Sequence, residues 1–170
     1  MNITLIGYRG SGKTTIGKLL AQKLWMDFVD TDALLAQRAG QSIKEIFATQ
    51  GEAAFRDLEA AVVTDAAARD NLVIATGGGV VLREANVAAL KKSGKVIYLY
   101  APAETLLERI GADPATAATR PALTAAGGTL AEIRAVLTVR EPLYQAAADV
   151  TLEVTRLTPE AAAQYLLRYL

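Results

Sequence analysis

The chain has 170 residues and carries 18 lysines and arginines against 18 aspartates and glutamates, so its formal net charge is zero. This length suits one domain with a substantial core, and the balanced charge gives no electrostatic reason to expect a nucleic acid or an anionic membrane as a partner. Cysteine and histidine are absent from the sequence, which excludes disulfides, thiolate metal sites and a histidine general base. A general base must therefore be Asp, Glu, Lys or Tyr.

The sequence contains no candidate targeting or membrane segment. Met1 stands directly before the first strand-like segment, and no apolar stretch reaches the roughly 20 residues needed to cross a bilayer. We therefore expect a cytoplasmic protein without a membrane partner. We also expect a monomer.

Apolar, strand-like segments alternate with helix-like segments along the chain. Strands are expected at residues 2–7, 27–30, 72–76, 96–101 and 149–154, and the helices between them include residues 13–25, 51–68 and 84–94. Ser42 to Glu45 fits a capping box that begins a short helix, and Thr158-Pro159 fits the start of the last helix. The alternation predicts a single α/β domain over residues 1–170, with a five-stranded parallel sheet covered by helices on both faces.

A phosphate-binding motif follows the first predicted strand. Residues 7–15, GYRGSGKTT, match the pattern G-x-x-x-x-G-K-[ST] and open a helix, as a P-loop requires. Backbone N–H groups of such a loop bind phosphates, Lys13 is expected to reach the β- and γ-phosphates, and the Thr14 hydroxyl is expected to ligate Mg²⁺. The predicted ATP-binding residues here are Gly10, Ser11, Gly12, Lys13, Thr14 and Thr15.

The absence of certain motifs excludes some classes of P-loop protein. A Ras-type GTPase would need N-K-x-D for guanine and D-x-x-G for its switch, and neither pattern occurs in the sequence. Nothing in the sequence indicates the extra domain of a motor ATPase or a helicase. Of the classes of P-loop protein considered, a small kinase fits the sequence. The motif does not identify the molecule that accepts the phosphoryl group.

Two aspartates follow the second predicted strand. Ligands of open α/β sheets bind at the carboxyl ends of the strands, so Asp30 and Asp32 are candidates for binding magnesium and an acceptor hydroxyl. Since the chain has no histidine, the candidate for the general base is a carboxylate. An alternative for Asp30 or Thr31 is that the side chain only caps the following helix.

One long segment lacks regular periodicity. Residues 111–128, GADPATAATRPALTAAGG, are rich in Gly, Pro, Ala and Thr, and a loop of this length in a compact domain is usually functional or disordered. Arg120 within it favours a mobile lid over a plain surface insertion. Further along, Pro142 lies inside a helical pattern and is expected to kink or break that helix just after Arg140.

The ordered set of motifs resembles the shikimate kinase family along essentially the whole chain. The segments that carry the resemblance are GYRGSGKTTIGKLLA, FVDTD, GEAAFRDLE, VIATGGGVVL, TRPAL and REPLYQAAAD. The resemblance implies that ATP and Mg²⁺ are used to phosphorylate the 3-hydroxyl of shikimate, in the route to chorismate and the aromatic amino acids.

The resemblance also implies a role for each acceptor-site residue. It assigns Asp30 to magnesium through water, and Asp32 to the substrate hydroxyls and to the base role. Arg56 and Arg140 would hold the shikimate carboxylate, while the backbone of Gly77, Gly78 and Gly79 would face the acid. These roles suit the chemistry, because the planar fork of arginine matches a carboxylate and an aspartate accepts hydrogen bonds from neighbouring hydroxyls.

On the ATP side, the resemblance places Arg109 and Arg156 near the adenine, and Arg120 on the transferring phosphate. The implied catalytic set is therefore Lys13, Asp32 and Arg120. The nearest alternative is another small P-loop kinase, such as a gluconate or nucleoside monophosphate kinase. An alternative from a different class is a non-catalytic nucleotide-binding protein, against which the intact P-loop and aspartates speak.

Overall fold

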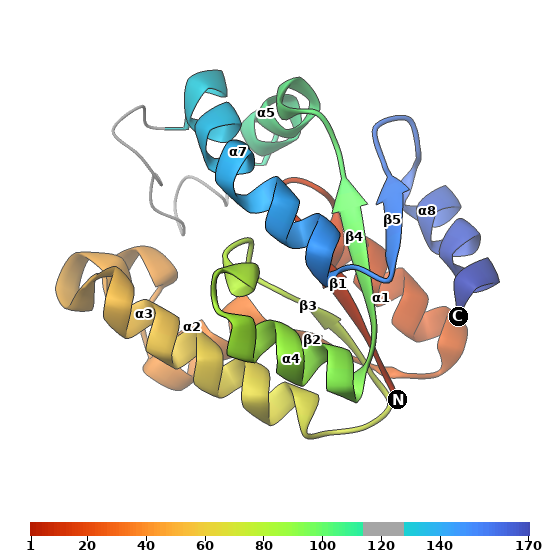
Figure 1. Ribbon diagram of the computed structural model, residues 1–170, viewed down its shortest axis with the longest axis horizontal. Helices are drawn as coiled ribbons and strands as arrows, with labels where there is room; N and C mark the ends of the chain where they lie inside the picture. The colour runs from red at the N-terminus through yellow and green to blue at the C-terminus, as the bar shows by residue number, and fades with distance from the viewer. Residues whose placement is uncertain (114–127) are drawn as a thin grey trace.

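The computed structural model of the chain describes residues 1–113 and 128–170 (Figure 1). Almost all of the predicted lid at residues 111–128, including Arg120, therefore lies outside the described residues. The strands are β1 (Asn2–Ile6), β2 (Asp27–Asp30), β3 (Leu72–Ala75), β4 (Gly94–Tyr100) and β5 (Val150–Glu153). The helices are α1 (Lys13–Leu24), α2 (Thr31–Ala39), α3 (Ile43–Ala67), α4 (Glu84–Ser93), α5 (Ala103–Gly111), α7 (Leu130–Ala147) and α8 (Pro159–Leu166), with 3₁₀ turns η1 (Val80–Leu82) and η2 (Leu167–Tyr169).

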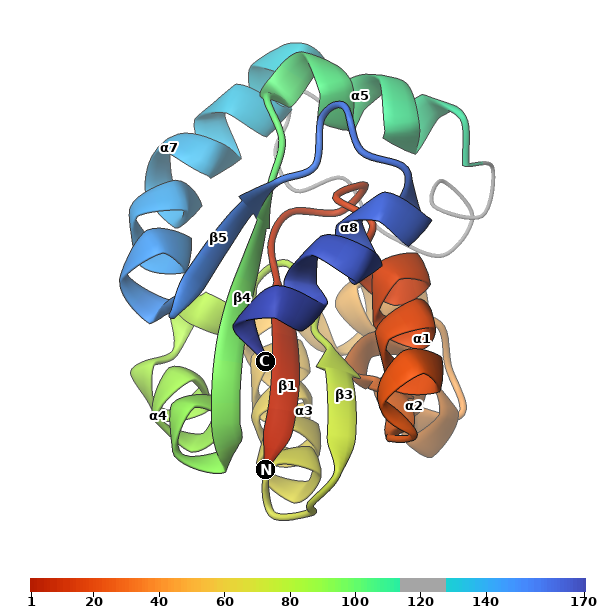
Figure 2. The same cartoon turned by 90° about the vertical axis from the view of Figure 1, so that its right-hand side faces the viewer.

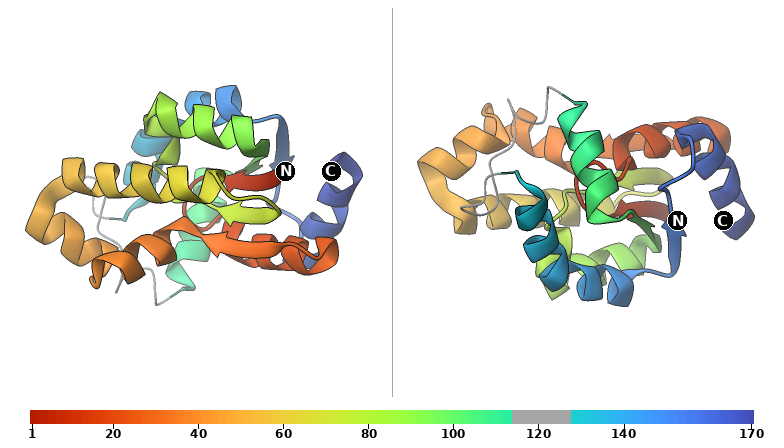
Figure 3. Two further views of the ribbon diagram at one scale, coloured as in Figure 1. Left: turned by 90° about the horizontal axis from the view of Figure 1, so that it is seen from below. Right: turned by 90° about the horizontal axis from the view of Figure 1, so that it is seen from above.

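The five strands form one sheet in the order β2-β3-β1-β4-β5, and every pairing between neighbours is parallel. This confirms the predicted five-stranded parallel sheet. Figures 2 and 3 show α1 and α8 on one face of the sheet and α3, α4 and α7 on the other. Among the helices that the structure describes, none is both long and apolar enough to cross a membrane.

The core follows from the composition of the central strands. Every residue of β1 and β3 is buried, and Leu5, Ile74 and Ile97 have no exposed surface. A parallel sheet is covered on both faces, so its strands are near-continuous apolar runs rather than alternating ones. The sheet is therefore a rigid base for the loops that follow its strands.

Two predicted helix starts are confirmed. The backbone N–H of Glu45 donates to the Ser42 hydroxyl at 3.1 Å, and the backbone N–H of Ser42 donates to the Glu45 carboxylate at 2.7 Å, which completes the capping box. Thr158 caps α8 by accepting from the Ala161 backbone N–H at 3.1 Å. The short helix that begins at Ser42 is continuous with the predicted helix 51–68, apart from one non-helical residue, Gly51.

A break of the helix after Arg140, one of the two expected effects of Pro142, does not occur, and a kink stays a prediction. Helix α7 runs from Leu130 to Ala147 with Pro142 inside it. Proline removes the hydrogen bond to the carbonyl four residues earlier, here that of Thr138, but Pro142 and Thr138 both lie on the exposed side of the helix. A carbonyl freed on that side faces solvent and need not stay unsatisfied, which is consistent with a helix that continues through the proline.

Candidate active site

The functional loops meet at one edge of the sheet. The P-loop follows β1, Asp30 ends β2, and the glycine run at 77–79 follows β3. Strand β3 pairs with both β1 and β2 in parallel, so the carboxyl ends of the three strands lie side by side. This arrangement places the predicted ATP site and the predicted acceptor site next to each other.

The P-loop adopts a backbone that glycine permits. Gly7, Gly10 and Gly12 all have positive φ angles, of 144°, 82° and 94°. The Lys13 ammonium donates to the carbonyl oxygens of Gly7 at 2.7 Å and Tyr8 at 2.9 Å, which holds this buried cation inside the loop. The structure therefore has the loop and lysine geometry expected of a phosphate cradle at the N-terminus of α1.

The two predicted magnesium residues are in contact. The Thr14 hydroxyl donates to Asp30 Oδ2 at 2.8 Å, while Asp30 Oδ1 accepts from the backbone N–H groups of Asp32 and Ala33. Asp30 is thus also the N-cap of α2, but it does not only cap the helix, because its second oxygen accepts from Thr14 of the P-loop.

The oxygen donors of this pair fit a magnesium ion. No cluster of three or more acidic side chains that could hold a metal occurs in residues 1–113 and 128–170. Mg²⁺ is bound through few protein oxygens and keeps several waters or substrate phosphates. A hydroxyl and a carboxylate oxygen beside the phosphate loop are a donor set of that kind.

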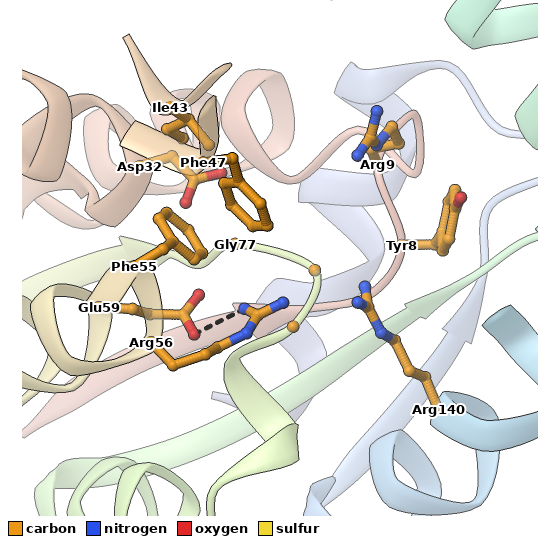
Figure 4. Close-up of a pocket in the computed structure, with 12 residues that line it drawn as sticks. Tyr8, Arg9, Asp32, Ile43, Phe47, Phe55, Arg56, Glu59, Gly77 and Arg140 are labelled. Atoms are coloured by element: carbon orange, nitrogen blue, oxygen red, sulfur yellow. Dashed lines mark hydrogen bonds and ion pairs between the residues drawn. The ribbon is translucent and has the colours of Figure 1, made fainter. Parts of the chain in front are cut away.

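The predicted acceptor residues line one pocket (Figure 4). Arg56 comes from α3 and Arg140 from α7, and both guanidinium groups point toward the glycine run. Asp32, on the first turn of α2, completes the polar part of the wall. The full lining is Tyr8, Arg9, Asp32, Ile43, Phe47, Phe55, Arg56, Glu59, Gly77, Gly78, Gly79 and Arg140.

Each glycine of the run faces a different side chain of the pocket. A Cβ at Gly77 would lie 2.5 Å from Asp32 Oδ1, and a Cβ at Gly79 would lie 2.3 Å from Arg56 Nη1. A Cβ at Gly78 would lie 3.5 Å from Arg140 Nη1. The bare backbone therefore makes room for the side chains of the site itself, an effect additional to the close approach of a ligand.

Glu59 is a pocket residue that the sequence analysis missed. It accepts from Arg56 Nη1 at 2.9 Å, and it is almost completely buried. Burial raises the pKa of its carboxyl and the nearby Asp32 raises it further, while Arg56 opposes the shift. Its position three residues after Arg56 on a helix was a usable signal, because side chains at that spacing share a face.

An apolar wall was missed as well. Phe47 and Phe55 pack with their ring centroids 4.7 Å apart, and the Arg56 guanidinium lies 5.0 Å from the centroid of Phe55. Ile43 extends the same wall. Nothing in the sequence separates these residues from ordinary core positions. Tyr8 and Arg9 occupy positions of the P-loop pattern that accept any residue, so the sequence did not indicate that they line the pocket either.

The residues expected near adenine lie outside this pocket. Arg109 Nη2 donates to the carbonyl of Val154 at 2.8 Å, which ties α5 to the end of β5, and Arg156 is exposed in the following turn. A Cβ at Gly10 would lie 3.0 Å from the side chain of Ile110, so α5 packs directly against the P-loop. Arg109 is thus on a helix that packs against the P-loop, and neither arginine lines the acceptor pocket.

A P-loop beside a small pocket with two arginines and a carboxylate, on a five-stranded parallel sheet, defines a P-loop kinase of small molecules. The family model described as "Shikimate kinase" matches residues 9–170. The chain belongs to the shikimate kinase family.

Individual relatives agree with this assignment. The chain is 43% identical over 166 residues to a shikimate kinase of Caldicellulosiruptor bescii, a match that covers 98% of this chain and 93% of the relative. The solved structure of an Acinetobacter baumannii shikimate kinase in complex with shikimate superposes with a TM-score of 0.91 at 36% identity, covering 99% of this chain and 91% of that one. A gluconokinase from Sinorhizobium meliloti, with a TM-score of 0.56 and 16% identity over 98% of this chain and 92% of that one, is similar in fold alone.

Proposed function

We propose that the chain transfers the γ-phosphoryl group of ATP to the 3-hydroxyl of shikimate, giving shikimate 3-phosphate in the route to chorismate and the aromatic amino acids. The observation that carries this proposal is the meeting of Asp32, Arg56 and Arg140 at the glycine run, directly beside the P-loop. A small acid with several hydroxyls matches this set, because guanidinium groups pair with its carboxylate and Asp32 accepts from its hydroxyls.

The role of each pocket residue follows from the chemistry of its side chain. Arg56 and Arg140 bind and orient the carboxylate of the acid, which brings the far side of the ring toward the P-loop. Asp32 orients the acceptor hydroxyl and takes its proton as the hydroxyl oxygen attacks the γ-phosphorus. The wall of Phe47 and Phe55 excludes water from the apolar face of the ring.

Phosphoryl transfer depends on alignment and on positive charge around the γ-phosphoryl group. Lys13 supplies one such charge from the P-loop, and Arg120, outside the described residues, would supply another from the lid. Thr14 would hold Mg²⁺ directly and Asp30 would hold it through water. When bound, the ion neutralises charge on the β- and γ-phosphate oxygens. On the nucleotide side, Arg109 and Arg156 would border the adenine.

A coupled assay of ADP release with shikimate, gluconate and AMP tests the substrate. We expect Mg²⁺-dependent turnover with shikimate well above that with the other two, and equal or greater turnover of gluconate or AMP would overturn the proposal. In the same assay, Asp32→Asn tests the base, with an expected loss of about 10²- to 10⁴-fold in kcat. Asp27→Asn, at the exposed opposite end of β2, is the matched control. Near-normal kcat in Asp32→Asn would remove this residue from the catalytic set.

The remaining expectations concern the protein in the cell. We expect a monomeric, cytoplasmic enzyme whose partners are its small substrates, and the balanced charge gives no electrostatic reason to expect a nucleic acid or an anionic membrane among them. Sedimentation of the purified protein across a range of concentrations measures the oligomeric state directly.

A further inference from the structure

Helix α7 brings two residues to the glycine run, and the proposed function uses only one of them. Arg140 and Tyr144 are four residues apart, so they lie one above the other on the same face of the helix. Tyr144 is fully buried, and its hydroxyl donates to the carbonyl oxygen of Gly78. A tyrosine of the core therefore bonds to the middle residue of the run that borders the acceptor pocket.

The three groups meet at one place. A Cβ built on Gly78 would lie 3.5 Å from Arg140 Nη1 and 3.6 Å from the hydroxyl oxygen of Tyr144. The carbonyl of Gly78 is thus turned toward α7. Because the C=O and the N–H of a trans peptide point in opposite directions, the N–H of Gly79 is turned away from that helix. Removing the hydroxyl would release the orientation of this peptide plane.

The hydroxyl is suited to act as a permanent donor. Burial raises the pKa of Tyr144 to about 12, although the charge and hydrogen bonding of Arg140 oppose the shift. The group therefore stays protonated at neutral pH and donates to Gly78 while it can accept from Arg140. Such a relay strengthens each of its bonds and couples the arginine to the glycine run.

The ring that carries this hydroxyl is held rigidly. Tyr98, on β4, stacks on Tyr144 with the ring centroids 4.9 Å apart and the planes at 27°. Both rings are buried, and burial also raises the pKa of Tyr98. Among the described residues, the Tyr98 hydroxyl has no hydrogen bond to the glycine run, so the two tyrosines share packing and differ in this contact.

We propose that Tyr144 is a positioning residue of the acceptor site: its hydroxyl orients the Gly78 peptide and so sets the glycine run against which the guanidinium groups of Arg56 and Arg140 lie. The inference rests on the proposed acceptor role of this pocket. The competing explanation is a satisfied polar group of the core that contributes stability alone.

The test compares Tyr144→Phe with Tyr98→Phe, since each removes one buried hydroxyl from the same stacked pair. We expect Tyr144→Phe to raise the KM for shikimate by about tenfold, the scale of one lost hydrogen bond, with the KM for ATP within about twofold of the unchanged protein. Tyr98→Phe should leave both KM values within about twofold. Thermal unfolding of both variants separates these effects from stability.

Equal KM values for shikimate in the two variants, or an equal rise in both KM values of Tyr144→Phe, would overturn the proposal. If Tyr144→Phe does not fold, 4-aminophenylalanine at position 144 keeps a donor at the same distance. An unchanged ratio of the two KM values in that variant then supports the role, and a rise for both substrates contradicts it. Absence of shikimate turnover in the unchanged protein would instead defeat the proposed function.

Discussion

At the scale of single residues, the glycine run at 77–79 is shaped by its neighbours. A Cβ at Gly79 would come within 2.3 to 2.6 Å of the Arg56 guanidinium, whereas the backbone at Gly79 has a φ of −95° that any residue adopts. The requirement for glycine at 79 is thus steric. The displaced group is the end of a flexible side chain, so the strain can be relieved by moving Arg56.

Gly79→Ala should therefore impair binding more than folding. We expect the KM for shikimate to rise by about 10- to 100-fold, since a charged hydrogen-bonding group is moved from its place, with a change in unfolding free energy below about 1 kcal/mol. Asp27→Asn, exposed at the opposite end of β2, is the control. Steady-state kinetics and urea denaturation measure the two effects, and a variant that loses stability but keeps its shikimate KM would refute the argument.

Glu59 provides a second prediction at this scale, in the pH dependence of stability. Its pKa is raised above the ordinary value of 4.5, so the folded state holds this proton more tightly than the unfolded chain. Between the unfolded and the folded pKa the folded state binds more protons, so this carboxyl makes the free energy of unfolding fall as pH rises through that window and level off above it. Glu59→Gln removes the titrating group.

We expect the free energy of unfolding of Glu59→Gln to fall less steeply with pH above about 4.5 than that of the unchanged protein. The measurement is denaturant unfolding at a series of pH values from acid to neutral. Glu52→Gln is the matched control, because Glu52 also pairs with Arg56 but is mostly exposed. Identical pH slopes for Glu59→Gln and the unchanged protein would show that burial does not raise this pKa.

At the scale of elements, the break in α3 positions the apolar wall. Gly51 has φ 84° and ψ 174°, a conformation open essentially to glycine, and it separates the turn that carries Phe47 from the turn that carries Phe55. The two rings nevertheless meet at 4.7 Å. The break therefore lets one helix present both rings to the pocket.

Gly51→Ala should destabilise the protein by about 1–3 kcal/mol, although a Cβ at this position meets nothing within 4 Å, because the backbone conformation itself is strained. It should also raise the KM for shikimate by separating the rings. Gly40→Ala introduces a similar positive-φ strain at the end of α2, outside the pocket lining, and should leave that KM unchanged. Thermal unfolding and kinetics on both variants make the comparison. A Gly51→Ala variant as stable as the unchanged protein would contradict it.

The elements also show where sequence reasoning succeeds. The strands and the caps at Ser42 and Thr158 were predictable because their signals are local, a run of apolar residues or a hydroxyl at the right spacing. Whether Pro142 kinks or breaks its helix could not be predicted, because the consequence of a lost hydrogen bond depends on whether the freed carbonyl faces water. That exposure is a property of the folded molecule.

At the scale of the whole molecule, the acceptor residues Asp32, Arg56 and Arg140 could be identified because each lies in a motif that resembles the family. Tyr144 could not, because its role arises from the contact of α7 with the glycine run, which is distant in the chain. Glu59 was missed although its spacing from Arg56 is a local signal, and Phe47 looks like an ordinary core residue in the sequence. Arg120 lies outside the described residues, so its predicted role at the transferring phosphate rests only on the resemblance to the family. The ATP-binding residues and the acceptor-binding residues could thus each be predicted from the sequence. The contact of α7 with the glycine run could not.

The order of the strands has a consequence for how the chain comes together during synthesis. Strand β3 lies between β1 and β2, yet those two strands are complete by residue 30 and β3 begins only at Leu72. On the ribosome, neither early strand can join the sheet until β3 has emerged, and closing so long a span slows folding. A nascent chain that stops before Leu72 already contains the phosphate-binding sequence but has no sheet edge on which to hold it.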